Sequence, residues 1–145
     1  FRSEQYDAMS SETAYLMLEL LKGVVQYGTG VRLRYKYKFT QTIGGKTGTT
    51  DNQSDGWFMG LTPDLVTGVW VGAEDRSAHF RSITYGQGAH MALPIFAIYM
   101  KKVWADESIG LSQGDFERPD GMNVVTDCDA IEEDKPIIKQ QKVVF

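Results

Sequence analysis

Residues 43–72 read IGGKTGTTDNQSDGWFMGLTPDLVTGVWVG, and this stretch decides the fold. It holds three short apolar or glycine-broken runs, at residues 43–50, 55–61 and 65–72, each with the length of a β-strand. Polar residues separate the runs, and the Thr62-Pro63-Asp64 turn between the last two predicts an antiparallel hairpin. The stretch therefore predicts three neighbouring strands.

A helix is expected on each side of these strands. Residues 11–27 carry apolar side chains three and four positions apart, with Ser11 as the predicted N-cap and Gly28 as the stop. Residues 91–104 form a second apolar run, in which Pro94 lies either near the first turn of a helix or at a kink. The chain is therefore expected to be an α+β protein, with an antiparallel sheet of three to five strands and flanking helices.

Residues 31–39 alternate between apolar and basic side chains, a pattern that predicts a strand with one buried face. We interpret the basic face as protection of a sheet edge against pairing with other chains. A nucleic-acid surface is the alternative interpretation, but the whole chain carries a net charge of −4 and lacks a wider basic footprint. No nucleic-acid partner is therefore expected. The large aromatic residues are expected in the core, namely Trp57, Phe58, Trp70 and Trp104.

Charge divides the chain near Asp106. Residues 1–105 hold eleven Lys and Arg against nine Asp and Glu, whereas residues 106–145 hold four against ten. We therefore predict a folded part over residues 1–105 and an acidic tail of unknown role over residues 106–145. Within the tail, a short strand is predicted at residues 137–145.

Several classes of site are disfavoured by composition. The single cysteine, Cys128, cannot form an internal disulfide, and the two histidines, His79 and His90, are eleven residues apart without converging ligands. No metal or other cofactor is therefore expected. The sequence also lacks a run of about 18 apolar residues of the kind that spans a membrane.

The strongest candidate for a functional motif is the segment Gly44-Gly45-Lys46-Thr47-Gly48-Thr49-Thr50. A phosphate-binding loop would need a glycine at position 40, which is Thr40, and a helix directly after the Lys-Thr pair. A strand beside a substrate is the better interpretation, since the glycines would let an extended peptide lie against it. Lys46 supplies a cation, the hydroxyls of Thr47 and Thr49 suit a carboxylate, and the backbone N–H near Thr49 suits an oxyanion. On these residues alone, a second interpretation stays open, namely an ordinary glycine-rich strand with an exposed lysine.

The wider context resembles a known family. The segments 46–50, 57–63 and 69–72, in this order, are similar to the C-terminal part of the transpeptidase domain of bifunctional (class A) penicillin-binding proteins. The segments Gly23 to Gly30 and Ala92 to Met100 resemble the family's stretches before and after these strands. The resemblance covers about residues 10–104.

The resemblance implies acyl transfer. In this family the serine of a Ser-x-x-Lys motif attacks a D-Ala-D-Ala stem peptide of peptidoglycan, and β-lactam antibiotics acylate the same serine. Carried over to this sequence, Lys46 would belong to the proton network, and Thr47 and Thr49 would hold the carboxylate of substrate or drug. The Thr49 N–H would form half of the oxyanion hole, and Gly48 and Thr50 would complete the substrate-binding strand. The family also implies a periplasmic or extracytoplasmic location, with a membrane anchor, a glycosyltransferase domain and the rest of the transpeptidase domain upstream.

The sequence departs from the family in one respect. No serine is followed by lysine three positions on or by asparagine two positions on; the serines are Ser3, Ser10, Ser11, Ser54, Ser77, Ser82, Ser108 and Ser112. The nucleophile, its general base and the middle motif are therefore missing from these residues, and the chain alone should be inactive. Whether a Ser-x-x-Lys motif precedes Phe1 stays open. The exposed apolar surface of such a partial domain should favour self-association. Two alternatives stay open: a fragment of a serine β-lactamase, and a non-catalytic peptide- or glycan-binding module with a degenerate transpeptidase fold.

Overall fold

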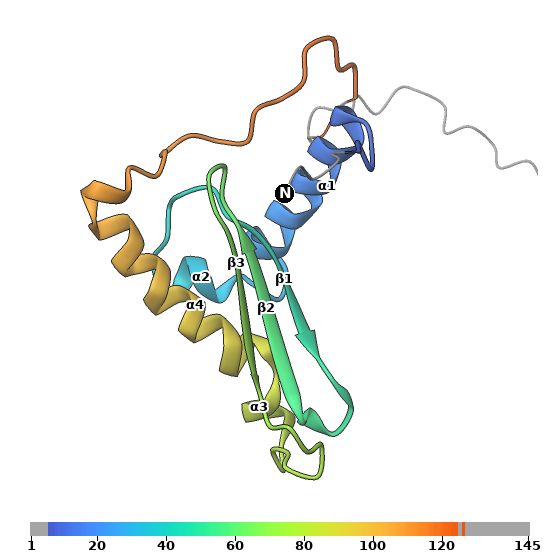
Figure 1. Ribbon diagram of the computed structural model, residues 1–145, viewed down its shortest axis with the longest axis vertical. Coiled ribbons are helices and arrows are strands. Elements are labelled where there is room, and N and C mark those ends of the chain that lie inside the picture. The colour runs from blue at the N-terminus through green and yellow to red at the C-terminus, as the bar shows by residue number, and fades with distance from the viewer. Residues whose placement is uncertain (1–5, 125, 127–145) are drawn as a thin grey trace, which may run out of the picture.

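The computed structural model describes residues 6–124 and 126 and has an α+β fold, as predicted (Figure 1). A three-stranded antiparallel sheet in the order β1-β2-β3 lies against the long helix α4, and α1 packs on β1. The elements are α1 (Ser11–Gln26), α2 (Arg32–Tyr35), β1 (Gly44–Thr49), β2 (Asp55–Leu61), β3 (Val66–Gly72), α3 (Ile83–Gly86) and α4 (Gly88–Ala105), with the short 3-10 turns η1 (Asp51–Gln53) and η2 (Glu107–Ile109).

The predicted hairpin is confirmed. Strands β2 and β3 pair from Asp55 opposite Gly72 to Leu61 opposite Val66. The turn is closed by Thr62, whose backbone N–H donates to the Leu65 carbonyl (2.8 Å) and whose hydroxyl accepts from the Leu65 N–H (3.0 Å). Strand β1 pairs with the other side of β2, so β2 is the central strand.

The core lies between the sheet and α4. The Phe58 and Phe96 rings, one from β2 and one from α4, are both fully buried and lie 4.8 Å apart between centroids. Gly60 makes this approach possible, because a Cβ atom there would lie 2.2 Å from the Phe96 ring. The buried cluster is completed by residues that precede β1 and residues of α4: Val25, Leu33, Phe39, Ile43, Ala92, Leu93, Ala97 and Met100.

The other face of the sheet is largely uncovered. Trp57 and Trp70 pair across β2 and β3 on this face, and each is 45% exposed. The prediction that both tryptophans belong to the core is therefore wrong. The prediction is confirmed for Phe58, and Trp104 is half-buried against the core, with its ring 5.3 Å from Phe39. The physical reason is that α4 covers one face of the sheet, whereas alternate residues of a strand point to opposite faces.

The helices begin close to the predicted positions. Ser10, and not Ser11, caps α1, since its hydroxyl accepts from the Thr13 N–H at 3.2 Å. Helix α4 begins at Gly88, three residues before the predicted start, so Pro94 lies inside the helix.

The strand predicted over residues 31–39 is wrong, and with it the interpretation as a protected sheet edge. The segment forms the helical turn α2 and then an irregular loop, in which Lys38 has a φ of 62°. Leu33 and Phe39 reach the core, and Arg34 fixes the loop by donating to the carbonyls of Phe39 (2.9 Å) and Gln41 (2.8 Å). The buried positions are therefore set by a helical turn and a folded loop, and the alternation in sequence does not indicate a strand.

After α4 the chain runs back toward α1 (Figure 1). Lys22 of α1 forms ion pairs of 2.8 Å with both Glu19 and Asp115, and Asp64 accepts from the Ser112 N–H at 2.7 Å. Burial lowers the pKa of Lys22, but the hydrogen bonds to Asp115 and Glu19 outweigh it and leave the pKa above its ordinary value. The first part of the acidic segment is thus attached to the fold. The boundary near Asp106 stays a prediction, and the predicted strand at residues 137–145 lies outside the described residues.

Candidate functional site

Strand β1 has one edge without a strand partner in the described part of the chain, and the Lys-Thr-Gly segment lies on it. The Thr50 N–H donates to the Asp55 carbonyl (3.1 Å). Hydrogen-bonded and non-hydrogen-bonded pairs alternate along antiparallel strands, so the backbone of Thr49, opposite Gly56, points away from β2. The same alternation directs the backbone of Thr47 outward. The N–H and C=O groups of both threonines therefore point outward along the free edge, where the Thr47 carbonyl accepts from the Lys46 side chain.

The side chains of β1 divide between the two faces of the sheet. Lys46 pairs with Met59 on the uncovered face and is exposed, whereas Thr47 pairs with Phe58 on the face toward α4. Nζ of Lys46 donates to the carbonyl of Thr47 at 2.8 Å. Lys46 and the two threonines are thus neighbours along the free edge, although their side chains leave the strand on opposite sides.

The hydroxyl of Thr47 is held by the turn that precedes α2. Its Oγ1 lies 2.7 Å from Oγ1 of Thr29, in the Gly28-Thr29-Gly30 turn. The sequence predicted this turn but not the contact, since nothing local indicates that residues 18 positions apart meet. The glycines on either side of Thr29, Gly28 and Gly30, indicated only the turn.

The hydroxyl of Thr49 is held by the start of α4. Its Oγ1 accepts from the backbone N–H of Gly88 at 3.1 Å, while the Thr49 residue itself is exposed. Thr50, by contrast, faces the structure: its Oγ1 accepts from the Asp55 N–H (3.1 Å) and lies 2.9 Å from Oγ of the buried Ser54. Of the two residues, Thr49 is exposed, whereas Thr50 is half-buried.

The glycines of β1 have an internal role. A Cβ atom at Gly45 would lie 2.8 Å from the Phe58 ring and 2.9 Å from the Met59 carbonyl, and one at Gly48 would lie 3.3 Å from Cβ of Trp57. Gly45 therefore needs to be glycine for the packing of β1 on β2, whereas a Cβ atom at Gly48 would make only a tight contact. Their predicted role beside a ligand stays a prediction.

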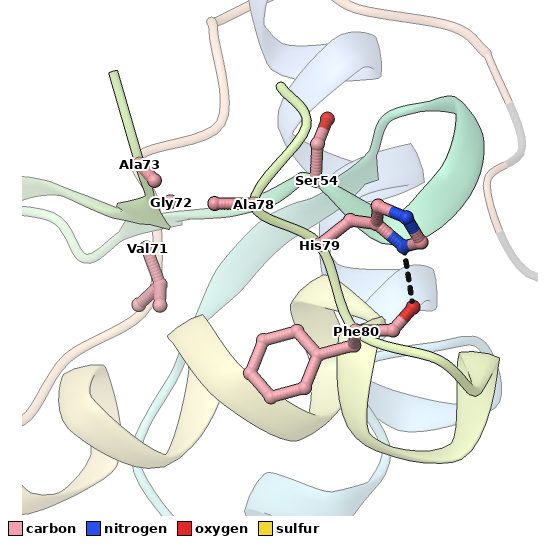
Figure 2. A pocket seen from close by; sticks show the side chains of 7 residues that line it. All are labelled: Ser54, Val71, Gly72, Ala73, Ala78, His79 and Phe80. Carbon is pink, nitrogen blue, oxygen red and sulfur yellow. Dashed lines mark hydrogen bonds between the residues drawn. The ribbon is translucent and has the colours of Figure 1, made fainter. Parts of the chain in front are cut away.

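A separate cavity of about 320 Å³ lies where β2 begins and β3 ends (Figure 2). His79 borders it, with Nδ1 3.1 Å from the Phe80 carbonyl oxygen. The lining is mainly apolar and consists of Ser54, Val71, Gly72, Ala73, Ala78, His79 and Phe80. None of the predicted site residues lines this cavity, so the candidate site is the free edge of β1.

No group of three or more His, Cys, Asp or Glu side chains is arranged to hold a metal ion in residues 6–124 and 126. Over the same residues, no helix has both the length and the apolar character needed to cross a membrane.

Comparison with known proteins places this geometry in a family. No protein-family model matches the chain. The chain is 36% identical over 102 residues to penicillin-binding protein 1A of Rickettsia bellii, which is 70% of the chain and 12% of that protein. It is 41% identical over 92 residues to penicillin-binding protein 1A of Pseudomonas aeruginosa, covering 63% and 11%. For penicillin-binding protein 1A of Clostridium tetani the identity is 33% over 120 residues, covering 83% and 15%.

A solved structure agrees with these relatives. The crystal structure of penicillin-binding protein 1A from Haemophilus influenzae superposes with a TM-score of 0.65 at 28% identity, over 77% of this chain and 17% of that one. The chain thus spans between about a tenth and a sixth of the length of these proteins. The chain therefore belongs to the penicillin-binding proteins and corresponds to a fragment of their transpeptidase domain.

Proposed function

We propose that the free edge of β1 is the carboxylate-binding strand of a D-Ala-D-Ala transpeptidase that cross-links peptidoglycan and is acylated by β-lactams. The observation that carries the proposal is the exposed Thr49, whose backbone points outward from the sheet and whose hydroxyl oxygen is already fixed by Gly88. An extended peptide can add to such an edge through main-chain hydrogen bonds. Its terminal carboxylate then meets hydroxyl donors at Thr47 and Thr49, with Gly48 between them and Thr50 ending the strand.

Lys46 and the Thr49 N–H supply the electrostatic part of the proposal. Lys46 is exposed and carries a positive charge beside the edge along which the substrate would lie. The outward N–H of Thr49 can donate to the oxyanion that develops when the substrate carbonyl is attacked. In this proposal the two groups stabilise charge, and a separate nucleophile attacks the carbonyl.

The nucleophilic serine is proposed to lie outside these 145 residues. No Ser-x-x-Lys pattern occurs in the sequence. The buried Ser54 is hydrogen-bonded to the Thr50 hydroxyl. We therefore expect the chain alone to form no acyl-enzyme. Intact mass measured before and after incubation with a reactive penicillin should be unchanged. A stoichiometric, hydroxylamine-labile adduct would contradict the assignment of the missing nucleophile.

The strand's role is tested in a full-length protein that contains this chain. Thr49→Val removes a hydrogen bond to a charged group, which is worth roughly 1.5–3 kcal/mol, so penicillin acylation should slow about 10- to 100-fold. Lys46→Met should also slow acylation. Thr67→Val on β3 and Lys102→Met on α4 are the matched controls, since neither residue lies on the free edge of β1. Equal acylation rates in Thr49→Val and Thr67→Val would exclude the proposal.

The same assay separates the alternatives. A β-lactamase would hydrolyse its acyl-enzyme rapidly, whereas a transpeptidase would keep it, and a degenerate binding module would form none. The location at the outer face of the cytoplasmic membrane, an upstream anchor and an accompanying glycosyltransferase domain are proposed on the same family relationship.

A further inference from the structure

Helix α4 begins in direct contact with the candidate site. Its first residue, Gly88, donates its backbone N–H to Oγ1 of Thr49 at 3.1 Å. The N-cap residue, Gln87, makes no side-chain hydrogen bond to the helix, although the first N–H groups of a helix lack partners within it. Thr49, 39 positions earlier, therefore acts as the cap that local sequence does not provide.

We infer that Gly88 is a positioning residue for the Thr49 hydroxyl in carboxylate recognition, an inference that rests on the function proposed above. A threonine hydroxyl has one hydrogen to donate and can accept through its oxygen. The Gly88 N–H occupies the oxygen and restricts rotation of the hydroxyl, so its hydrogen stays free for a second partner. A carboxylate accepts hydrogen bonds and donates none. The order Gly88 N–H, Thr49 hydroxyl, ligand carboxylate is thus chemically matched at each step, and bonds in such a chain reinforce one another.

Only glycine permits this approach of helix to strand. A Cβ atom at position 88 would lie 2.3 Å from the Gly48 carbonyl oxygen and 2.4 Å from that of Trp57. These are backbone atoms of β1 and β2, so they cannot rotate away as a flexible side chain would. Any larger residue must push the start of α4 off the sheet and break the Gly88–Thr49 hydrogen bond.

The test uses a full-length protein containing this chain and two probes, benzylpenicillin and its methyl ester, which lacks the charged carboxylate. Gly88→Ala should slow acylation by benzylpenicillin about tenfold, the effect of losing one hydrogen bond near a charge. Acylation by the ester should change less than about twofold. Gly86→Ala is the matched control, because a Cβ atom there would also be crowded, 2.3 Å from Cβ of Gln53, without touching Thr49. An equal loss for both probes in Gly88→Ala would overturn the inference.

Thr49→Val separates this inference from the proposed function. If Thr49→Val leaves the ratio of the two acylation rates unchanged, the carboxylate-binding role of Thr49 fails, and the inference with it. If Thr49→Val lowers the ratio but Gly88→Ala does not, only the positioning role of Gly88 fails. In the double variant, Gly88→Ala should lower the ratio no further, since the hydroxyl that it positions is gone.

A second measurement does not depend on Gly88→Ala folding correctly. In the full-length Thr49→Val variant, the Gly88 amide loses its acceptor, so its hydrogen exchange should become about tenfold faster than in the unmodified protein. Unchanged exchange at Gly88 would show that Thr49 does not cap α4 and would overturn the inference.

Discussion

Gly60→Ala should destabilise the packing of α4 on the sheet. A Cβ atom at position 60 would lie 2.2, 2.4 and 3.1 Å from three carbon atoms of the Phe96 ring. Carbon atoms pack at about 3.5–4.0 Å, so the two nearest contacts would be short by more than about 1 Å. Phe96 is fully buried, and its ring centroid lies 4.8 Å from that of Phe58. Overpacking of this kind costs about 1–3 kcal/mol, and we expect the upper half of that range.

Equilibrium urea unfolding of the 145-residue chain, followed by tryptophan fluorescence, measures this loss. Gly23→Ala in α1 is the control, because its Cβ atom would have no neighbour within 4 Å and alanine favours a helix by roughly 0.5–1 kcal/mol. Phe96→Leu should relieve part of the clash, so the double variant should be less destabilised than the sum of the single variants. If the shift of the urea midpoint in Gly60→Ala corresponds to less than about 0.5 kcal/mol of destabilisation, the packing argument is refuted.

Two other predictions concern the surface of the fold. Burial raises the pKa of Asp115, but hydrogen bonds from Lys22 and the Phe116 N–H outweigh it and lower the pKa below its ordinary value. A lowered carboxylate pKa stabilises the fold above the unfolded pKa, and this stability is lost as the pH falls through the folded value. Asp115→Asn should therefore weaken the acid sensitivity of urea unfolding between about pH 5 and pH 2, by less than about 1 kcal/mol because the pair is partly exposed; an identical pH dependence would contradict this. The uncovered face with Trp57 and Trp70 should cause concentration-dependent self-association in sedimentation, which Trp57→Thr with Trp70→Thr should reduce. A monomer at every concentration would refute the association.

The sheet was predictable from sequence because its signals are local. The run at residues 55–61 coincides with β2, and the Thr62-Pro63-Asp64 turn leads directly into β3. Turn chemistry and strand length are encoded within a few residues of each other. The hairpin needed no knowledge of distant contacts.

Residues 31–39 could not be predicted in the same way. Their period of two fits a strand, but a strand also needs a neighbour, and the sequence does not show which edges are free. In the structure Arg34 closes a loop by binding two carbonyls, of Phe39 and Gln41, and Leu33 and Phe39 become buried from an irregular backbone. The prediction that Trp57 and Trp70 are buried failed for a related reason. An apolar run in the sequence does not reveal whether one face of its strand is covered or both.

The position of the candidate site residues on a strand was predictable from sequence, but the contacts that hold their side chains were not. The Lys-Thr-Gly motif identified Lys46, Thr47 and Thr49 on a strand, and the structure places that strand at the edge of the sheet. The partners that fix the two hydroxyls, Thr29 and Gly88, come from distant segments. Contacts of this kind depend on how closely helices approach the sheet, which is a property of the assembled fold.

Glycines along the contact between β2 and α4 control how closely the helix approaches the sheet. Gly60 affects the packing of the core, and Gly56 affects the position of Gly88. Gly60 faces Phe96 and pairs with Gly45, one residue before Lys46, whereas Gly56 faces the start of α4 and pairs with Thr49. A Cβ atom at Gly56 would lie 2.9 Å from Cα of Gly88. A substitution at Gly56 should therefore displace Gly88 and disturb the Thr49 hydroxyl, while one at Gly60 should mainly loosen the core. Substitutions at the Thr49 end of the sheet are thus expected to change both stability and carboxylate recognition. Substitutions at the Gly45 end should mainly change stability.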